Sequence, residues 1–135
     1  MTQTLHEAVG VLRKAPCEAR LSMALDREIA RYYRSLIPKW IQTALPRYDP
    51  HITVVRPEKD LVDEGTLHNY DGREVQFLYA AELQQSRNYL WLPAYSEQLE
   101  QIRLELGLPV VNNSDLVPPD GCRKPFHITI ANLLT

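Results

Sequence analysis

The apolar positions of the chain change their spacing along its length, and this pattern predicts where helices and strands lie. In residues 1–14, Leu5, Val9 and Leu12 recur at helical spacing, which predicts a short helix. Residues 17–25 follow neither period clearly, and a strand is one interpretation of them. The start of the chain therefore predicts a helix followed by an ambiguous segment.

A second helix is predicted after Asp26, which is a suitable N-cap residue. Pro38 should end or kink this helix, because proline lacks the backbone N–H that a helix interior needs. We expect Tyr33 and Trp40 to pack on its inner side rather than to bind a ligand. The apolar face of the predicted helix contains Ile29, Tyr32, Tyr33, Leu36, Ile37, Trp40 and Ile41.

Alternating and β-branched residues predict strands further along the chain. Residues 51–55 read His-Ile-Thr-Val-Val, which is typical of a strand. Residues 75–83 and 89–92 predict a hairpin, with a turn at 84–88 between them. Residues 126–133 predict a final strand.

The segments between these strands complete the predicted order. Residues 57–72 are polar and predict a loop, whereas residues 95–106 have helical periodicity and end at Gly107, a natural C-cap. Residues 108–122 contain several turn-forming pairs and predict a long loop with at most a short strand. The order predicts a mixed α+β fold in a single domain, residues 1–135.

Composition narrows the class of protein and of ligand. A chain of 135 residues, 44% of them hydrophobic, can bury a core, and no apolar run is long enough to cross a bilayer. Because a signal-peptide pattern is also lacking at the N-terminus, we expect a cytoplasmic protein with no membrane partner. The net charge of −2 argues against a long nucleic acid as partner, although a small anionic ligand remains possible. Cys17 and Cys122 lie outside any C-x-x-C pair, so we expect free thiols and no zinc site.

One short sequence occurs twice, and both copies lie in predicted strands. His-Ile-Thr-Val stands at residues 51–54, and His-Ile-Thr-Ile stands at 127–130. Residues i and i+2 of a strand project to the same face, so each motif offers an imidazole and a hydroxyl together. We expect the two strands to present one shared cleft with four candidate catalytic residues, His51, Thr53, His127 and Thr129.

Two facing imidazoles and two hydroxyls suit the cleavage of a phosphodiester. One neutral histidine can take a proton from the attacking hydroxyl, while the other, protonated, donates one to the leaving oxygen. The threonine hydroxyls can donate hydrogen bonds to the nonbridging oxygens, and the scheme needs neither metal nor cofactor. A single copy of such a tetrapeptide usually belongs to an ordinary strand and has no catalytic role. Two copies among only four histidines favour the catalytic interpretation.

The paired motifs resemble those of the 2H phosphoesterase superfamily, whose members carry two His-x-Thr/Ser motifs in a duplicated, two-lobed α+β fold. The resemblance implies a compact fold in which antiparallel strands carry the two motifs around a central cleft. Residues 32–39 (Tyr-Tyr-Arg-Ser-Leu-Ile-Pro-Lys) and 46–56 (Pro-Arg-Tyr-Asp-Pro-His-Ile-Thr-Val-Val-Arg) are similar to the phage anti-CBASS branch. Its members destroy the cyclic di- and trinucleotide signals of bacterial defence. The resemblance implies metal-free cleavage of a 3′–5′ linkage through a 2′,3′-cyclic phosphate, in the host cytoplasm if the protein is phage-encoded. It implies catalytic roles for the four motif residues, with the choice of base left open.

Further residues are candidates for substrate binding. Trp91 is predicted to stack on a nucleobase, and the alternative is that the alternating Tyr89, Trp91 and Pro93 simply form a sheet face. Arg47, Arg56 and Lys124 are predicted to attract phosphates, with solvated surface positions as the alternative. Residues 110–124 could close over the ligand as a lid or serve only as a connector.

Two alternative functions remain open. One is an RNA 2′,3′-cyclic phosphodiesterase that processes RNA ends, and the other is a sponge that binds a cyclic nucleotide without cutting it. The sequence does not predict base preference, ring size or oligomeric state.

Overall fold

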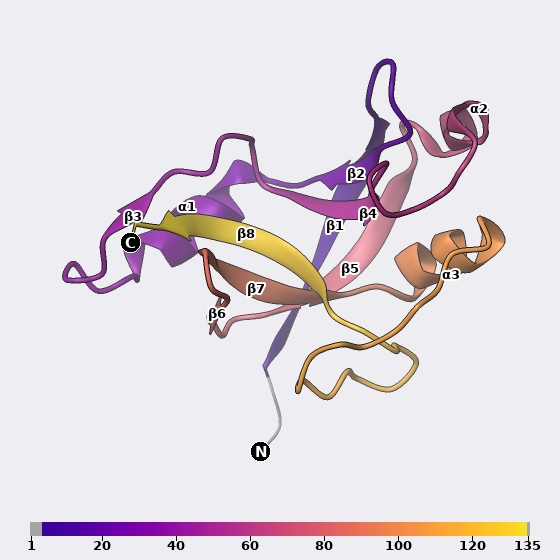
Figure 1. Cartoon of the computed structure of the whole chain (residues 1–135). Helices are drawn as coiled ribbons and strands as arrows, with labels where there is room; N and C mark the ends of the chain where they lie inside the picture. The colour runs from indigo at the N-terminus through magenta and orange to yellow at the C-terminus, as the bar shows by residue number, and fades with distance from the viewer. Residues whose placement is uncertain (1–3, 135) are drawn as a thin grey trace.

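The computed structural model describes residues 4–134 of the chain, which form an α+β fold (Figure 1). The strands are β1 (Leu5–Lys14), β2 (Leu21–Ala24), β3 (Thr43–Ala44), β4 (His51–Val55), β5 (Glu74–Ala80), β6 (Gln84–Gln85), β7 (Tyr89–Tyr95) and β8 (Phe126–Leu133). The helices are α1 (Arg27–Ser35), α2 (Glu64–Leu67) and α3 (Glu97–Glu105), and a 3₁₀ turn, η1, spans His68–Tyr70. The strands form one antiparallel sheet in the order β3-β8-β7-β5-β1-β2-β4, with β6 paired to β7. The α+β class predicted from the sequence is confirmed.

Strand β1 corrects the first prediction, since most of the segment expected to be helical is extended. β1 pairs with both β2 and β5, so it lies inside the sheet. A Cβ at Gly10 would come within 2.5 Å of the Met23 side chain and 2.9 Å of the Ala24 carbonyl oxygen. The close approach of β2 therefore requires glycine here, and tertiary pairing overrides a weak helical pattern.

Helix α1 begins where the sequence predicts and ends before Pro38. The side chain of Asp26 accepts a hydrogen bond from the backbone N–H of Glu28 at 2.9 Å, as expected of an N-cap. Tyr33 is buried as predicted. Trp40 is 83% exposed, so the prediction that it packs inside is wrong, because the helix ends at Ser35 and no longer directs that ring inward.

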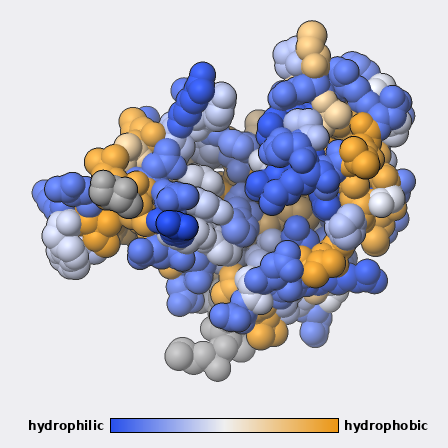
Figure 2. Space-filling view, viewed as in Figure 1, coloured by the Kyte–Doolittle hydropathy of each residue, from blue (hydrophilic) through white to orange (hydrophobic). Residues whose placement is uncertain are grey.

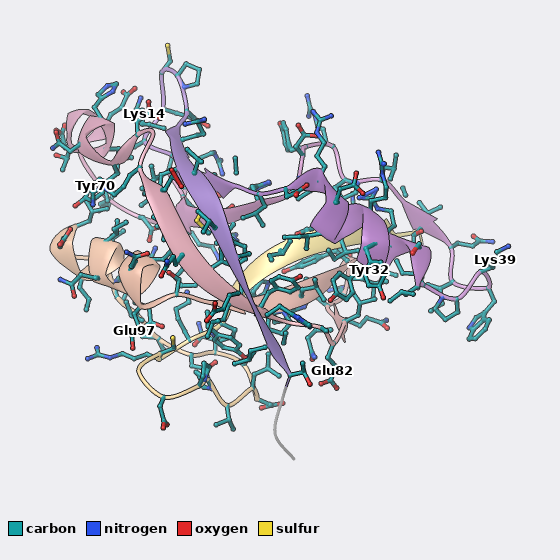
Figure 3. All side chains as sticks on the ribbon, turned by 180° about the vertical axis from the view of Figure 1, so that it is seen from behind. Lys14, Tyr32, Lys39, Tyr70, Glu82 and Glu97 are labelled. Atoms are coloured by element: carbon teal, nitrogen blue, oxygen red, sulfur yellow. The ribbon has the colours of Figure 1, made fainter. Side chains whose placement is uncertain are left out.

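The loop predicted for residues 57–72 contains α2 and η1, because buried Leu67 and Tyr70 anchor two short turns to the core. Figure 3 shows Tyr70 and Lys14 toward the same end of the molecule, and Lys14 forms an ion pair with Glu64 of α2 there. The hairpin prediction is confirmed by the antiparallel β5–β7 pair, although β6 occupies part of the expected turn. The predicted C-cap Gly107 follows α3 with a φ of +76°.

The sheet is curved, so β4, the strand at one end of the strand order, contacts β8 (Figure 1). Where β4 and β8 face each other, one backbone carbonyl group of each strand accepts a hydrogen bond from an arginine side chain of a helix, instead of from the other strand. The Nε of Arg34 in α1 donates to the carbonyl oxygen of Ile130 at 3.1 Å, and Nη1 of Arg103 in α3 donates to that of Val54 at 2.7 Å. The two motif strands therefore lie beside one another without a ladder of backbone hydrogen bonds between them.

Candidate active site

Both motifs face one pocket of about 650 Å³, as the alternation along their strands predicts. The side chains that line this pocket include the half-buried His51, Thr53, His127 and Thr129. The residues that alternate with them are at most 1% exposed and belong to the core with α1 and α3, namely Ile52, Val54, Ile128 and Ile130. Figure 2 shows mainly hydrophilic residues over the middle of this face, where β8 and β4 lie.

His127 is enclosed by two aromatic residues of the neighbouring strand β7. The indole of Trp91 lies parallel to the imidazole, with a ring-centroid distance of 3.6 Å and an interplanar angle of 7°. The Tyr89 hydroxyl lies 3.0 Å from Nδ1 of the same imidazole. Trp91 is in turn fixed because its Nε1–H donates to the Ser86 hydroxyl at 2.9 Å. The ring of His127 thus has one face covered and one nitrogen occupied.

The surroundings of His127 keep its imidazole neutral. The pKa of His127 is lowered from 6.5 to about 4, mainly by burial, with smaller contributions in the same direction from the positive charges of Arg56 and Lys124. Burial also lowers the pKa of Lys124, with smaller contributions from Arg103 and Arg56. A neutral imidazole with a free lone pair is the form that a general base requires.

His51 has a different environment, at a more open position. Its Nδ1 lies 2.8 Å from the backbone carbonyl oxygen of Asp49. A carbonyl oxygen only accepts hydrogen bonds, so Nδ1 carries a hydrogen and Nε2 is the nitrogen left for a ligand. In the protonated imidazolium, this Nε2–H is a proton donor.

Two of the three predicted cationic residues line the same pocket. Arg56 and Lys124 are both among its lining residues, together with Arg20, Lys59 and Arg103. These cations outnumber the two acidic residues of the lining, Glu58 and Asp60, so the pocket favours an anion. The phosphate-binding role predicted for Arg56 and Lys124 therefore fits their positions.

Arg47 lies outside this pocket, in a neighbouring cavity of about 240 Å³. That cavity is also lined by His51 and Thr129, so it adjoins the motif residues from another side. Tyr48 is 66% exposed there, and the Arg47 guanidinium lies 5.4 Å from its ring centroid. The sequence did not single out Tyr48, since an exposed tyrosine in a turn carries no spacing signal.

Trp91 does not have the position that a base-stacking platform needs. It is 6% exposed, and the face that it offers is taken by the imidazole of His127. The predicted stacking on a nucleobase is therefore wrong. The alternative interpretation, in which Trp91 is part of a sheet face, describes its place, with contact to His127 added.

A buried ion pair beneath the pocket was also missed from the sequence. Arg103 of α3 donates to both carboxylate oxygens of Asp60 and to the Val54 carbonyl, and its residue is 8% exposed. Burial alone would raise the pKa of Asp60, but hydrogen bonds from Arg103 and from the backbone N–H of Arg56 outweigh it and lower the pKa. The pair links α3, β4 and the segment after β4. Nothing in the helical periodicity of α3 distinguishes this arginine from a solvated one.

Asn113 and Lys124 of the predicted loop line the pocket, so this loop borders the site. Glu100 of α3 accepts hydrogen bonds from the backbone N–H groups of Arg123 and Lys124, which fixes the end of the loop. Both cysteines are free thiols, as predicted.

Two features are absent from residues 4–134. No cluster of three or more histidine, cysteine, aspartate or glutamate side chains there has the arrangement of a metal site. No helix in the same range has the length and hydropathy needed to cross a membrane.

The chain was compared with protein-family models, with curated proteins and with solved structures, and none of the three comparisons gave a match.

Proposed function

We propose that this protein is a metal-independent phosphodiesterase that cleaves the 3′–5′ linkages of cyclic di- and trinucleotide immune signals and thereby counters bacterial CBASS defence. The observation that carries the proposal is the convergence of His51, Thr53, His127 and Thr129 on one cationic pocket. The substrate class rests on the sequence resemblance, and the pocket supports it through its charge.

In the proposed reaction His127 is the general base and His51 the general acid. The 2′-hydroxyl of the substrate attacks the adjacent phosphorus, and its proton passes to Nε2 of His127. The bond between phosphorus and the 5′-oxygen breaks, and that oxygen takes a proton from Nε2 of His51. The products are a linear oligonucleotide ending in a 2′,3′-cyclic phosphate and an enzyme with the proton moved between its histidines. The neutral state of His127 and the carbonyl contact of His51 support this assignment.

The hydroxyls and cations stabilise charge that develops on the phosphoryl group. Thr53 and Thr129 stand two residues from the histidines on the same strand faces, so their O–H groups can donate to the nonbridging oxygens. Arg56 and Lys124 add positive charge in the same pocket. The two threonine donors need no reorganisation, because β4 and β8 hold them before the substrate arrives.

The shape of the site supports a substrate with bulk on both sides of the phosphodiester. The larger cationic pocket and the cavity beside Tyr48 both include His51 and Thr129 in their linings. A phosphodiester at the shared residues would place one nucleoside toward each cavity. The exposed ring of Tyr48 offers a face for a nucleobase, since every base has a π-face on which an aromatic ring can stack.

The test is to incubate the protein with a 3′,3′-linked cyclic dinucleotide in excess EDTA and to follow the products by mass. We expect linearisation by the wild type and its loss in His51→Ala and His127→Ala. His6→Ala is the control, because the His6 ring packs at a tilt against Tyr79 and does not line the pocket. Thermal melts establish that the variants are folded.

The same experiment separates the alternatives. Intact ligand that is tightly bound contradicts the proposal and indicates a sponge. Ligand that neither binds nor reacts contradicts it as well, and cleavage of RNA ends bearing a 2′,3′-cyclic phosphate would then be measured.

A further inference from the structure

Tyr89 contacts the imidazole of His127 but takes no part in the proton transfers of the proposed reaction. Its hydroxyl lies 3.0 Å from Nδ1, and both residues line the cationic pocket. A tyrosine hydroxyl both donates and accepts, so this contact is compatible with either neutral tautomer of the imidazole. Which tautomer forms decides whether Nε2 is a proton acceptor or a proton donor.

The charges of the pocket favour one of the two tautomers. Arg56 and Lys124 lie close enough to His127 to lower its pKa, and both line the pocket. Cations attract the lone pair of an unprotonated Nε2, whereas an N–H at that atom would point positive charge toward them. Nδ1 then carries the hydrogen and donates it to the Tyr89 oxygen.

We propose that Tyr89 is a positioning residue for His127, accepting a hydrogen bond from Nδ1–H so that the basic Nε2 faces the pocket, while stacked Trp91 holds the ring in that orientation. The inference rests on the proposed function for its catalytic meaning. The tautomer itself is a property of the protein without substrate.

Two contacts along β7 give this arrangement its rigidity. Trp91 pairs with Thr129 in the β7–β8 register, and Pro93 pairs with His127, so the indole reaches the imidazole diagonally across the two strands. The hydrogen bond from the indole to Ser86 ties the same side chain to the turn before β7. Rotation of the imidazole away from Tyr89 would break a stack at 3.6 Å.

The decisive measurement is the ¹⁵N NMR spectrum of histidine-labelled, ligand-free protein at neutral pH, with the His127 signals assigned by their loss in His127→Gln. We expect a neutral imidazole with its hydrogen on Nδ1. In Tyr89→Phe, which removes only the hydroxyl, we expect the Nε2–H tautomer to gain population. Tyr48→Phe is the matched control, because Tyr48 lies beside the site in the neighbouring cavity and makes no hydrogen bond to His127.

A wild-type His127 with its hydrogen on Nε2 overturns the inference, and so does a tautomer that Tyr89→Phe leaves unchanged. If cleavage is observed, Tyr89→Phe should lower kcat on the order of tenfold with little change in KM, as the loss of one hydrogen bond implies. If no cyclic nucleotide is cleaved, the proposed function fails while the NMR result still decides the inference. A thermal melt of Tyr89→Phe shows whether the variant is folded.

Discussion

At the scale of single residues, the two histidines share one motif but differ in environment. His127 contacts Trp91 and Tyr89 and lies near the cations Arg56 and Lys124, whereas His51 contacts a backbone carbonyl. Identical sequence motifs therefore give unequal groups, because the neighbouring strands differ. This inequality is what separates the base from the acid in the proposed reaction.

The lowered pKa of His127 predicts an unusual pH profile. The acidic limb of kcat/KM reports the free enzyme's base, so we expect activity to fall near pH 4 rather than near pH 6.5. The phosphodiester anion should raise this pKa in the complex, so the limb of kcat should lie at higher pH. Initial rates between pH 3.5 and 8 measure the acidic limbs of kcat/KM and of kcat. Circular dichroism at each pH checks that the sample is folded. A kcat/KM limb at 6.5 would contradict the assignment of His127 as a buried base.

Trp91 predicts a second residue-scale effect. Trp91→Leu removes the ring that covers the imidazole, so water reaches His127 and its pKa should rise toward 6.5. An NMR titration of the His127 signals measures this shift without any substrate. Trp40→Leu is the control, since Trp40 is 83% exposed and lies outside the pocket linings. Equal His127 pKa values in the two variants would exclude burial by Trp91 as the cause.

At the scale of elements, helices α1 and α3 supply hydrogen-bond donors to the edges of the two motif strands. Arg34 and Arg103 satisfy carbonyl groups of β8 and β4 that would otherwise lack a partner at this junction. The strands can consequently stay apart at the pocket. If they were paired through a full ladder of hydrogen bonds, their motif residues would lie on one continuous sheet face without room for a ligand.

The buried pair of Arg103 and Asp60 predicts a large effect on stability. Arg103→Met removes the cationic donor of the Asp60 carboxylate and of the Val54 carbonyl, which should lower the free energy of unfolding by about 3 kcal/mol. Arg31→Met is the matched control, because the Arg31–Glu28 pair is mostly exposed and should contribute less than about 1 kcal/mol. Urea denaturation measures both. Similar losses in the two variants would show that the buried pair has no special role.

At the scale of the whole molecule, the curvature of the sheet creates the site. β4 stands at one end of the strand order and β8 next to the other end, yet they contact each other because the sheet curves back. The histidines lie 76 residues apart in the chain, from position 51 to position 127, so their meeting depends on the complete fold. The stability of the protein and the integrity of the pocket are for this reason coupled.

The lowered pKa of His127 in the folded protein predicts how the free energy of unfolding depends on pH. The pKa of His127 is about 4 in the folded protein and near 6.5 in the unfolded chain, so the unfolded state binds the proton first as the pH falls. His127 thus has no effect on the free energy of unfolding above pH 6.5 and lowers it progressively between 6.5 and 4. His127→Gln, which has no such titration, should show a flatter decline over this window. Parallel curves for the two proteins in urea would contradict the prediction.

Local patterns in the sequence were sufficient to locate several elements and the motif residues. Alternation predicted β4 and β8, Asp26 predicted the start of α1, and Gly107 predicted the end of α3. Each of these signals depends on neighbours a few residues away, because caps and strand faces are set by backbone geometry. The same geometry determined which side of each motif strand carries the polar residues.

Only the tertiary structure decided what surrounds those residues. It made β1 a strand through pairing on both sides, left Trp40 exposed, and placed Trp91 against an imidazole instead of a ligand. It also brought Tyr89 and Arg103 to the site from elements with no motif of their own. These outcomes depend on contacts between distant segments, and local spacing in a single sequence does not predict such contacts.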